Sequence, residues 1–268
     1  MESKKLDNIL LIHDKMENVL QNMKENSVDI VISDPPFGVR KEEEWDDKNN
    51  FIYKVGGWLT NCLRVSKHGV IWFGADKMFP YVVDHLIKNN NHEIFKRQHA
   101  WRKPEGSQMN GASNNNIWYS DECIWIFSKD WDKTKSYGMD MSYSFNDFSY
   151  RTMAKKETGH PTAKPVALMR KLIGHYSAVG ETILDPFSGS FSTAIACIDM
   201  GRRCVAIEQS PLPDKPITDV DGDNPDYYGR GIIRVEKHLS APRMFKGVED
   251  IELNTEDYDT TMDLFDDK

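Results

Sequence analysis

The chain has 268 residues, of which 39% are hydrophobic and 28% charged, with a mean hydropathy of −0.60 and a formal net charge of −8. No apolar stretch approaches the ~18 residues of a membrane span, which excludes an integral membrane protein built on helices. The first residues lack the apolar core of a secretory signal, so we expect a cytoplasmic protein. The cysteines have no metal-ligand spacing, which favours reduced thiols and predicts no metal site; they are Cys62, Cys123, Cys197 and Cys204.

Charge is distributed unevenly along the chain. Residues 245–268 contain nine acids and two lysines, a net charge of −7, so the remaining 244 residues carry about −1. Residues 151–171 contain six basic residues and one acid. A near-neutral body with one basic stretch is compatible with contact to phosphates, although charge alone fits a solvated loop equally well.

Apolar runs separated by turn residues predict alternating strands and helices. The predicted strands are residues 8–13, 28–33, 69–74, 93–101, 122–128, 182–184 and 204–208. The predicted helices are residues 15–24, 51–66, 77–89, 164–177, 191–200 and 226–239, and the longest predicted loops are residues 39–50, 102–116, 131–161 and 211–225. This alternation implies one doubly wound α/β domain over residues 1–247, with helices on both faces of its sheet. We expect the acidic tail, residues 248–268, to be disordered.

The most informative motif is Asp34-Pro35-Pro36-Phe37, which directly follows the apolar run at residues 28–33. Ligand sites of open α/β sheets lie at the carboxyl ends of strands. The Asp34 carboxylate and the Pro35 carbonyl can accept hydrogen bonds from an exocyclic amino group, and Phe37 offers a face on which a ring can stack. The motif therefore predicts a site for a planar base. The alternatives are that Asp34 caps a turn and that Phe37 belongs to the core.

A second motif, Asp185-Pro186-Phe187-Ser188-Gly189-Ser190, joins a predicted strand to a helix. Its small residues allow close approach of a ligand to a helix N-terminus, and Glu208 ends the next strand, where a carboxylate can accept hydrogen bonds from both ribose hydroxyls. Taken alone, this pattern could be a dinucleotide site or only a tight turn with a surface acid. However, the turn lacks GxGxxG and carries Asp185 near the place of a pyrophosphate, which favours a cationic or amino-bearing ligand. Asp34, Asp185 and Glu208 thus end three strands, which predicts one shared pocket.

Taken in order, these motifs resemble those of the DNA amino-methyltransferases that use S-adenosylmethionine, in the subgroup whose catalytic motif precedes the cofactor motif. The matching segments are residues 9–13, 26–37, 101–104, 122–129, 160–168 and 185–190. The resemblance extends over about residues 8–239. It implies a Rossmann-like sheet of seven strands, the last one antiparallel, with helices on both faces. It also implies a small inserted target-recognition region near residues 98–116 and 131–159.

The resemblance implies a site-specific enzyme that methylates the N6 amino group of an adenine flipped out of double-stranded DNA, as in restriction-modification systems. Cytosine N4 is the alternative, because the cytosine members of the family more often begin the catalytic motif with serine. RNA or a protein glutamine as methyl acceptor also stays open. The implied catalytic residues are Asp34, Pro35, Pro36 and Phe37. The implied cofactor-binding residues are Asp14, Asp34, Thr162, Lys164, Asp185, Phe187, Ser188, Gly189, Ser190 and Glu208. The expected DNA contacts are Arg102, Lys103, Arg151, Lys155 and Lys156.

The chain departs from the family pattern at two places. Phe191 stands where the family usually has a further glycine, which leaves open a DNA-binding relic that no longer binds the cofactor. Asp14-Lys15 stands where the family commonly has Gly-Asp, and we expect Asp14 to bind the adenine amino group of the cofactor.

The sequence leaves the assembly and the partners of the chain open. A monomer and a homodimer are both compatible with it, and nothing in it identifies a cognate nuclease. Residues 261–265 are similar to the Leu-Phe peptides that dock on bacterial sliding clamps; an acidic tail with a chance Leu-Phe is the alternative.

Overall fold

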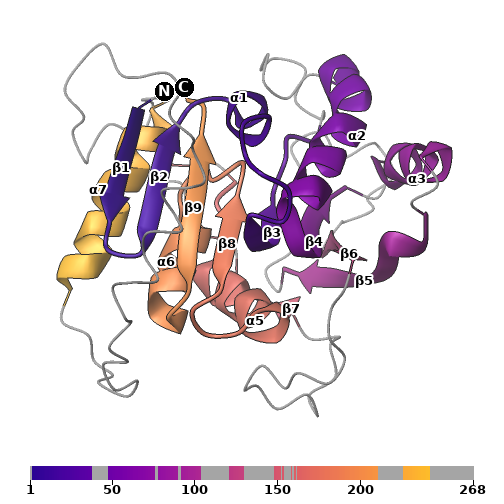
Figure 1. Cartoon of the computed structure of the whole chain (residues 1–268). Coiled ribbons are helices and arrows are strands. Elements are labelled where there is room, and N and C mark those ends of the chain that lie inside the picture. Colours follow the sequence, from indigo (N-terminus) through magenta and orange to yellow (C-terminus); the bar gives the residue numbers. More distant parts are fainter. Residues whose placement is uncertain are drawn as a thin grey trace.

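The computed structural model describes residues 2–37, 48–75, 78–89, 92–103, 121–129, 148–151, 153, 158, 160, 162–210 and 226–241. Within these ranges the chain forms one sheet of nine strands in the order β1-β2-β9-β8-β3-β4-β6-β5-β7 (Figure 1). The strands are β1 (Glu2–Leu6), β2 (Ile9–His13), β3 (Val28–Ser33), β4 (Ser66–Gly74), β5 (Phe95–Arg102), β6 (Asp121–Ser128), β7 (Phe148–Ser149), β8 (Thr182–Asp185) and β9 (Arg203–Glu208). The helices are α1 (Met16–Leu20), α2 (Lys48–Val65), α3 (Phe79–Lys88), α5 (Val166–Tyr176), α6 (Ser192–Met200) and α7 (Tyr227–Ser240), with a 3₁₀ turn, η3 (His92–Ile94). None of these helices is long and apolar enough to cross a bilayer.

The predicted α/β fold is confirmed, and the seven predicted strands form the centre of the sheet. Strands β2, β9, β8, β3 and β4 are parallel, and β6 is antiparallel to both β4 and β5. Among the seven predicted strands the antiparallel one, β6, thus lies between two others, and the edge strand β1 is antiparallel to β2.

Several boundaries differ from the prediction. The described residues add two edge strands, β1 and β7, that were not predicted. Strand β1 was missed because three of its five residues are charged, as suits an edge strand open to solvent. Helix α2 begins at Lys48, inside the predicted loop at residues 39–50, and helix α1 spans only half of the predicted residues 15–24.

Each face of the sheet has its own apolar core. Helices α1, α2 and α3 cover one face, where Met16, Leu59 and Val82 belong to the same buried apolar cluster as Val31 of β3. Helices α5, α6 and α7 cover the other face, on the far side of the strands in Figure 1. Because both faces are covered, every residue of β3 is buried, which explains its almost continuous apolar sequence.

The order of the strands reverses between β3 and β8. From β3 the chain passes through α2 to β4 on one side, whereas β8 pairs with β3 on the other side and leads on to β9. Ligands of open α/β sheets bind at the carboxyl ends of strands at such a switch point. Asp34 follows β3 and Asp185 ends β8, so the two carboxylates flank it.

Phe191 has a left-handed backbone (φ 58°), which is rare for a residue other than glycine, and its side chain is fully buried. The ring packs edge-on against Tyr228, with 6.1 Å between centroids, and against Gly231 of α7. A Cβ atom at position 231 would lie 1.7 Å from Cδ2 of Phe191. The bulk that replaces a glycine at this turn is therefore accommodated in the core beneath α7.

We expect Gly231→Ala to destabilise the protein, because the new methyl group displaces the Phe191 ring, and Phe191→Ala to cost about 3–5 kcal/mol through the cavity it leaves. In the Phe191→Ala background, Gly231→Ala should become neutral or stabilising, since alanine favours a helix over glycine by about 1 kcal/mol. Urea-induced unfolding of the four proteins measures this coupling. Additive effects of the two substitutions would contradict the packing described here.

Candidate active site

The corner after β3 brings Asp34, Pro35 and Phe37 to the switch point. Pro35 is buried, and Phe37 is half-buried against the core on the side of α5. Oδ2 of Asp34 forms an ion pair of 2.7 Å with Nζ of Lys164, and 23% of the Asp34 side chain stays open to solvent. The corner therefore presents one carboxylate that is both solvent-accessible and held by a cation.

Lys164 lies just before α5, and only 7% of it is exposed. Its ammonium forms a second ion pair of 2.8 Å with Oε1 of Glu122. Three aromatic rings surround it, with their centroids 5.1–5.8 Å from Nζ: Phe37, Phe73 and Trp101. The electron-rich faces of these rings favour a cation, so the site holds Lys164 charged despite its burial.

Glu122 connects this pair to a second lysine. Its Oε2 accepts a hydrogen bond of 3.0 Å from Nζ of Lys103. Asp34, Lys164, Glu122 and Lys103 thus alternate in sign along one line, which we call the ion chain. They come from four separate segments: the corner after β3, the residue before the cap of α5, the start of β6 and the residue after β5.

Sequence reasoning missed Glu122, although it assigned functions to the other three members of the ion chain. Because β6 is antiparallel, its first residues lie at the edge where β4 ends, with Cys123 opposite Gly74. The sequence shows Glu122 as the acid directly before the largely apolar run at residues 123–128, which places it at a strand end but does not show which groups it meets.

The ion chain changes the pKa values of Asp34, Lys164 and Glu122. Burial raises the pKa of Asp34 to about 6, although the Lys164 ammonium opposes the rise. Burial alone would lower the pKa of Lys164, but Asp34 and Glu122 outweigh it and hold the pKa above its usual range. Burial would likewise raise the pKa of Glu122, and its two lysines hold that pKa below the ordinary value. Near neutral pH Asp34, Lys164 and Glu122 are therefore charged.

Asp185 is buried on the other side of the switch point. Oδ2 accepts a hydrogen bond from Oγ1 of Thr193, and Oδ1 accepts one of 3.2 Å from the backbone N–H of Phe187. Burial raises the pKa of Asp185 to about 7, and the Asp34 and Glu208 carboxylates add to the rise against these hydrogen bonds. A buried carboxylate in the field of two others is well suited to a cationic ligand.

Glu208, at the end of β9, accepts hydrogen bonds from the backbone N–H groups of Gly189 (2.7 Å) and Ser210 (2.8 Å). Burial raises its pKa, although these hydrogen bonds oppose the rise. Gly189 has φ 48°, and a Cβ there would lie 2.9 Å from Nε2 of His160, so the turn requires glycine for both reasons. Asp14 is next to Glu208: its N–H donates to the Glu208 carbonyl, and its Oδ1 accepts hydrogen bonds from Lys15 and Asn18.

The remaining predicted cofactor residues lie along the same edge. Phe187 is half-buried and meets Trp58 of α2 edge-on at 5.1 Å, a contact that sequence reasoning missed. Ser188 and Ser190 are buried, and the Ser188 hydroxyl donates to the Asp185 carbonyl. Thr162 is exposed, and its N–H donates to Nδ1 of His160. The assignment of these residues to a cofactor stays a prediction.

The predicted DNA contacts differ in their surroundings. The Arg102 side chain is 62% exposed, whereas that of Lys103 is 14% exposed and bound to Glu122. Arg151 is exposed, and Lys155 and Lys156 lie outside the described residues. Of the predicted target-recognition segments, residues 98–102 belong to β5, and most of the rest, like the tail with its clamp-like peptide, lies outside the described ranges. These assignments stay predictions.

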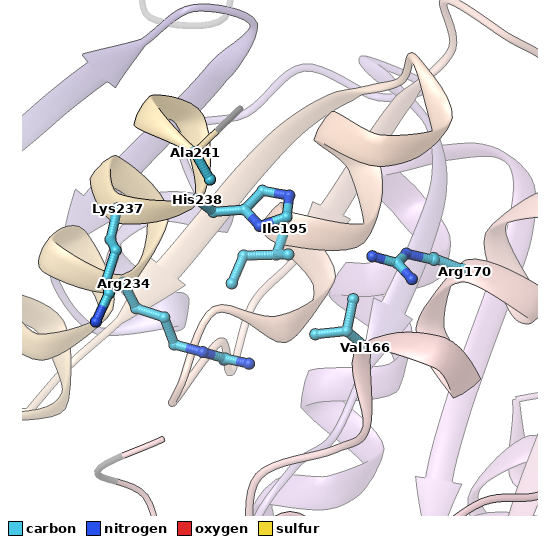
Figure 2. Close-up of a pocket in the computed structure, with 7 residues that line it drawn as sticks. All are labelled: Val166, Arg170, Ile195, Arg234, Lys237, His238 and Ala241. Carbon is cyan, nitrogen blue, oxygen red and sulfur yellow. The ribbon is translucent and has the colours of Figure 1, made fainter. Parts of the chain in front are cut away.

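A separate cleft of about 320 Å³ lies between α5, α6 and α7, and no predicted site residue lines it (Figure 2). Its lining residues are Val166, Arg170, Ile195, Arg234, Lys237, His238 and Ala241. Asp199 pairs with both Arg170 and His238 at its rim. Burial lowers the pKa of Arg234 to about 10, and its guanidinium donates to the Ser190 carbonyl and the Ser192 hydroxyl. Helix α7 thereby fixes the end of the turn that carries Asp185.

A doubly wound sheet with an Asp-Pro-Pro-Phe corner on one side of its switch point, an acid on the other side and a further acid at the end of the next strand is typical of the DNA methyltransferases. The chain belongs to the N6/N4 DNA methylase family, whose sequence pattern matches residues 28–212, which confirms the family read from the motifs. Its place in the subgroup whose catalytic motif precedes the cofactor motif stays a prediction.

Among curated relatives, the type II methyltransferase M2.MboI of Moraxella bovis is 26% identical over 219 residues, which are 71% of this chain and 79% of that protein. The structure of an M1.HpyAVI–SAM complex is similar with a TM-score of 0.60 and 22% identity, over 87% of this chain and all of that one. The cytosine-N4-specific PvuII DNA methyltransferase gives a TM-score of 0.64 at 15% identity, over 85% of this chain and 94% of that one.

We expect Asp185→Asn to stabilise the protein at pH 8. The native carboxyl, with a pKa of about 7, binds a proton that an unfolded aspartate of pKa ~3.9 has lost, so the stability of the wild type falls as the pH rises from 4 to 7. The substitution removes this loss, a gain on the order of 2–4 kcal/mol at pH 8 that should shrink to about 1–2 kcal/mol at pH 5, because the loss begins only above about pH 4. Denaturant titrations at both values measure it, with Asp84→Asn of the exposed Asp84–Lys88 pair as control. Equal stability of Asp185→Asn and wild type at pH 8 would contradict this reading of the site.

Proposed function

We propose that the protein methylates the N6 amino group of adenine in double-stranded DNA, with S-adenosylmethionine as the methyl donor, the cofactor of this family. The observation that carries the proposal is the position of the Asp34 corner and the Asp185 turn on the two sides of one switch point. A base bound at the Asp34 corner and a cofactor bound at the Asp185 turn would therefore lie next to each other, at the ends of the paired strands β3 and β8.

The residues around Asp185 fit this cofactor. S-adenosylmethionine carries a sulfonium and an ammonium group, and the Asp185 carboxylate is buried with no cationic partner among the described residues. Glu208, at the end of the next strand, has a carboxylate that suits ribose hydroxyls. Phe191, whose ring is taken up by the core, leaves this turn free of its bulk. When bound, the cofactor supplies an activated methyl group.

The Asp34 corner supplies the acceptors that the amino group needs. The lone pair of an exocyclic amino nitrogen is delocalised into its ring, so the nitrogen is a poor nucleophile. Asp34 and the Pro35 carbonyl would accept its two N–H groups, which favours a tetrahedral nitrogen and frees the lone pair. Phe37 would stack on the base once it has left the duplex, a contact worth ~1–3 kcal/mol. Asp34 is a weak base, so water takes the proton finally.

Adenine N6 is favoured over cytosine N4 by the aspartate that begins the catalytic motif. Cytosine N4 is the second candidate, because a cytosine-N4-specific enzyme has a similar fold. Digestion of DNA methylated by the protein, followed by mass spectrometry of the nucleosides, distinguishes N6-methyladenine from N4-methylcytosine. N4-methylcytosine alone would overturn the adenine assignment, and methylation of RNA but not DNA would overturn the choice of substrate.

We expect Asp34→Ala to reduce methyl transfer to duplex DNA by more than about 100-fold, the scale on which the loss of one preorganised polar group acts. Binding of S-adenosylmethionine, measured by isothermal titration, should change little, because the Asp185 turn is intact. Asp84→Asn serves as the surface control. Full turnover by Asp34→Ala would refute the catalytic role, and the absence of cofactor binding by the wild type would favour the DNA-binding relic.

A further inference from the structure

We propose that Glu122 is a positioning residue for Asp34: it holds the Lys164 ammonium between two carboxylates, so that Asp34 keeps accepting capacity for the amino group of the base. The inference rests on the function proposed above and adds a residue to the same site. It is carried by the geometry of the ion chain and by the place of Glu122 in the sheet.

The Lys164 ammonium lies almost equally close to the carboxylates of Asp34 and Glu122. Nζ lies 2.7 Å from Asp34 and 2.8 Å from Glu122, so neither carboxylate has the ammonium to itself. Lysine has a long stem with several rotatable bonds, and an ion pair with Asp34 alone would not fix the place of its head group. Glu122 stands on a strand of the sheet, and the rings of Phe37 and Trp101 close the remaining sides.

The second oxygen of Glu122 is held by Lys103, which fixes the carboxylate from the other side. Lys103 directly follows β5, and its ammonium also lies over the ring of Trp101, 4.6 Å from the centroid. Lys103 therefore acts on Asp34 through Glu122 and Lys164. Without it, Glu122 would be free to draw the Lys164 ammonium away from Asp34.

Among the described residues, the charged groups that act on Asp34 come from four segments of the fold. They are Lys164 before α5, Glu122 on β6, Lys103 after β5 and Asp185 at the end of β8. Burial has the largest effect on the pKa of the Asp34 carboxyl and raises it; Glu122 adds to this rise, whereas Lys164 and Lys103 oppose it. The substitution of Glu122 or of Lys103 should therefore move the ionisation of Asp34 in opposite directions.

The test is the single-turnover rate of methyl transfer between pH 5 and 8.5, at saturating S-adenosylmethionine and duplex DNA. Glu122→Gln removes the negative charge of Glu122, so that Asp34 is the remaining carboxylate partner of Lys164 in the ion chain. The acidic limb of the profile should then move down by about one pH unit, as is usual for one nearby charge. The plateau should fall severalfold, because the ammonium now occupies the acceptor.

With Lys103→Gln the acidic limb should move up, because Glu122 then competes more strongly for Lys164. Glu122→Asp keeps the charge and should leave the limb within a few tenths of a pH unit of the wild type. Glu236→Gln, in the exposed Lys4–Glu236 pair, makes the same chemical change elsewhere and should leave the whole profile unchanged. Thermal melts identify any variant that does not fold; should Glu122→Gln fail, the upward shift with Lys103→Gln decides.

Two outcomes overturn the inference: profiles that coincide with the wild type for both Glu122→Gln and Lys103→Gln, and shifts of both variants in one direction. A severalfold loss of rate without a shifted limb would show Glu122 to be structural only, which also overturns it. A wild-type protein that methylates no DNA would instead overturn the proposed function, so the two failures are distinguishable.

Discussion

The site depends on the ion pairs that the buried ammonium of Lys164 forms with Asp34 and Glu122. Three carboxylates stand at neighbouring strand ends, and without a cation their mutual repulsion would favour protonation. Burying charges is expensive unless each has a partner, and the alternation of signs from Asp34 to Lys103 meets that condition with two acids and two bases. The fold allows this because the antiparallel β6 begins where the parallel strands end.

Asp185 shows the opposite arrangement, because its carboxylate is buried near other acids and, within the part of the chain that the structure describes, accepts hydrogen bonds from Thr193 and Phe187 alone. A protein selected for stability alone would not keep such a group. Its retention is understandable if a positively charged ligand completes the site, since binding then returns the free energy lost on folding. The charge of Asp34, on one side of the switch point, is thus balanced by Lys164, whereas the charge of Asp185, on the other side, would be balanced by a bound ligand.

Local patterns were enough to predict the parallel core, because β3 is apolar throughout and the motifs at residues 34–37 and 185–190 directly follow strands. The edge strand β1 was missed because a charged strand open to solvent has no apolar periodicity. Glu122 was missed for another reason: its partners, Lys103 and Lys164, are 19 and 42 residues away, and only the pairing of strands brings them together. Contacts between distant segments leave no local signature, so the site could be located but not assembled from the sequence.

The turn after β8 contains Phe191, whose side chain depends on a glycine in another helix. Its backbone at Phe191 has a shape that usually demands glycine, and the aromatic ring is accepted only because α7 has no side chain at Gly231, forty residues later. The large side chain thus stands at position 191 before α6, and the glycine stands at position 231 in α7. Homologues with glycine at the first position should therefore tend to have a larger residue at the second, and the two columns of an alignment should co-vary.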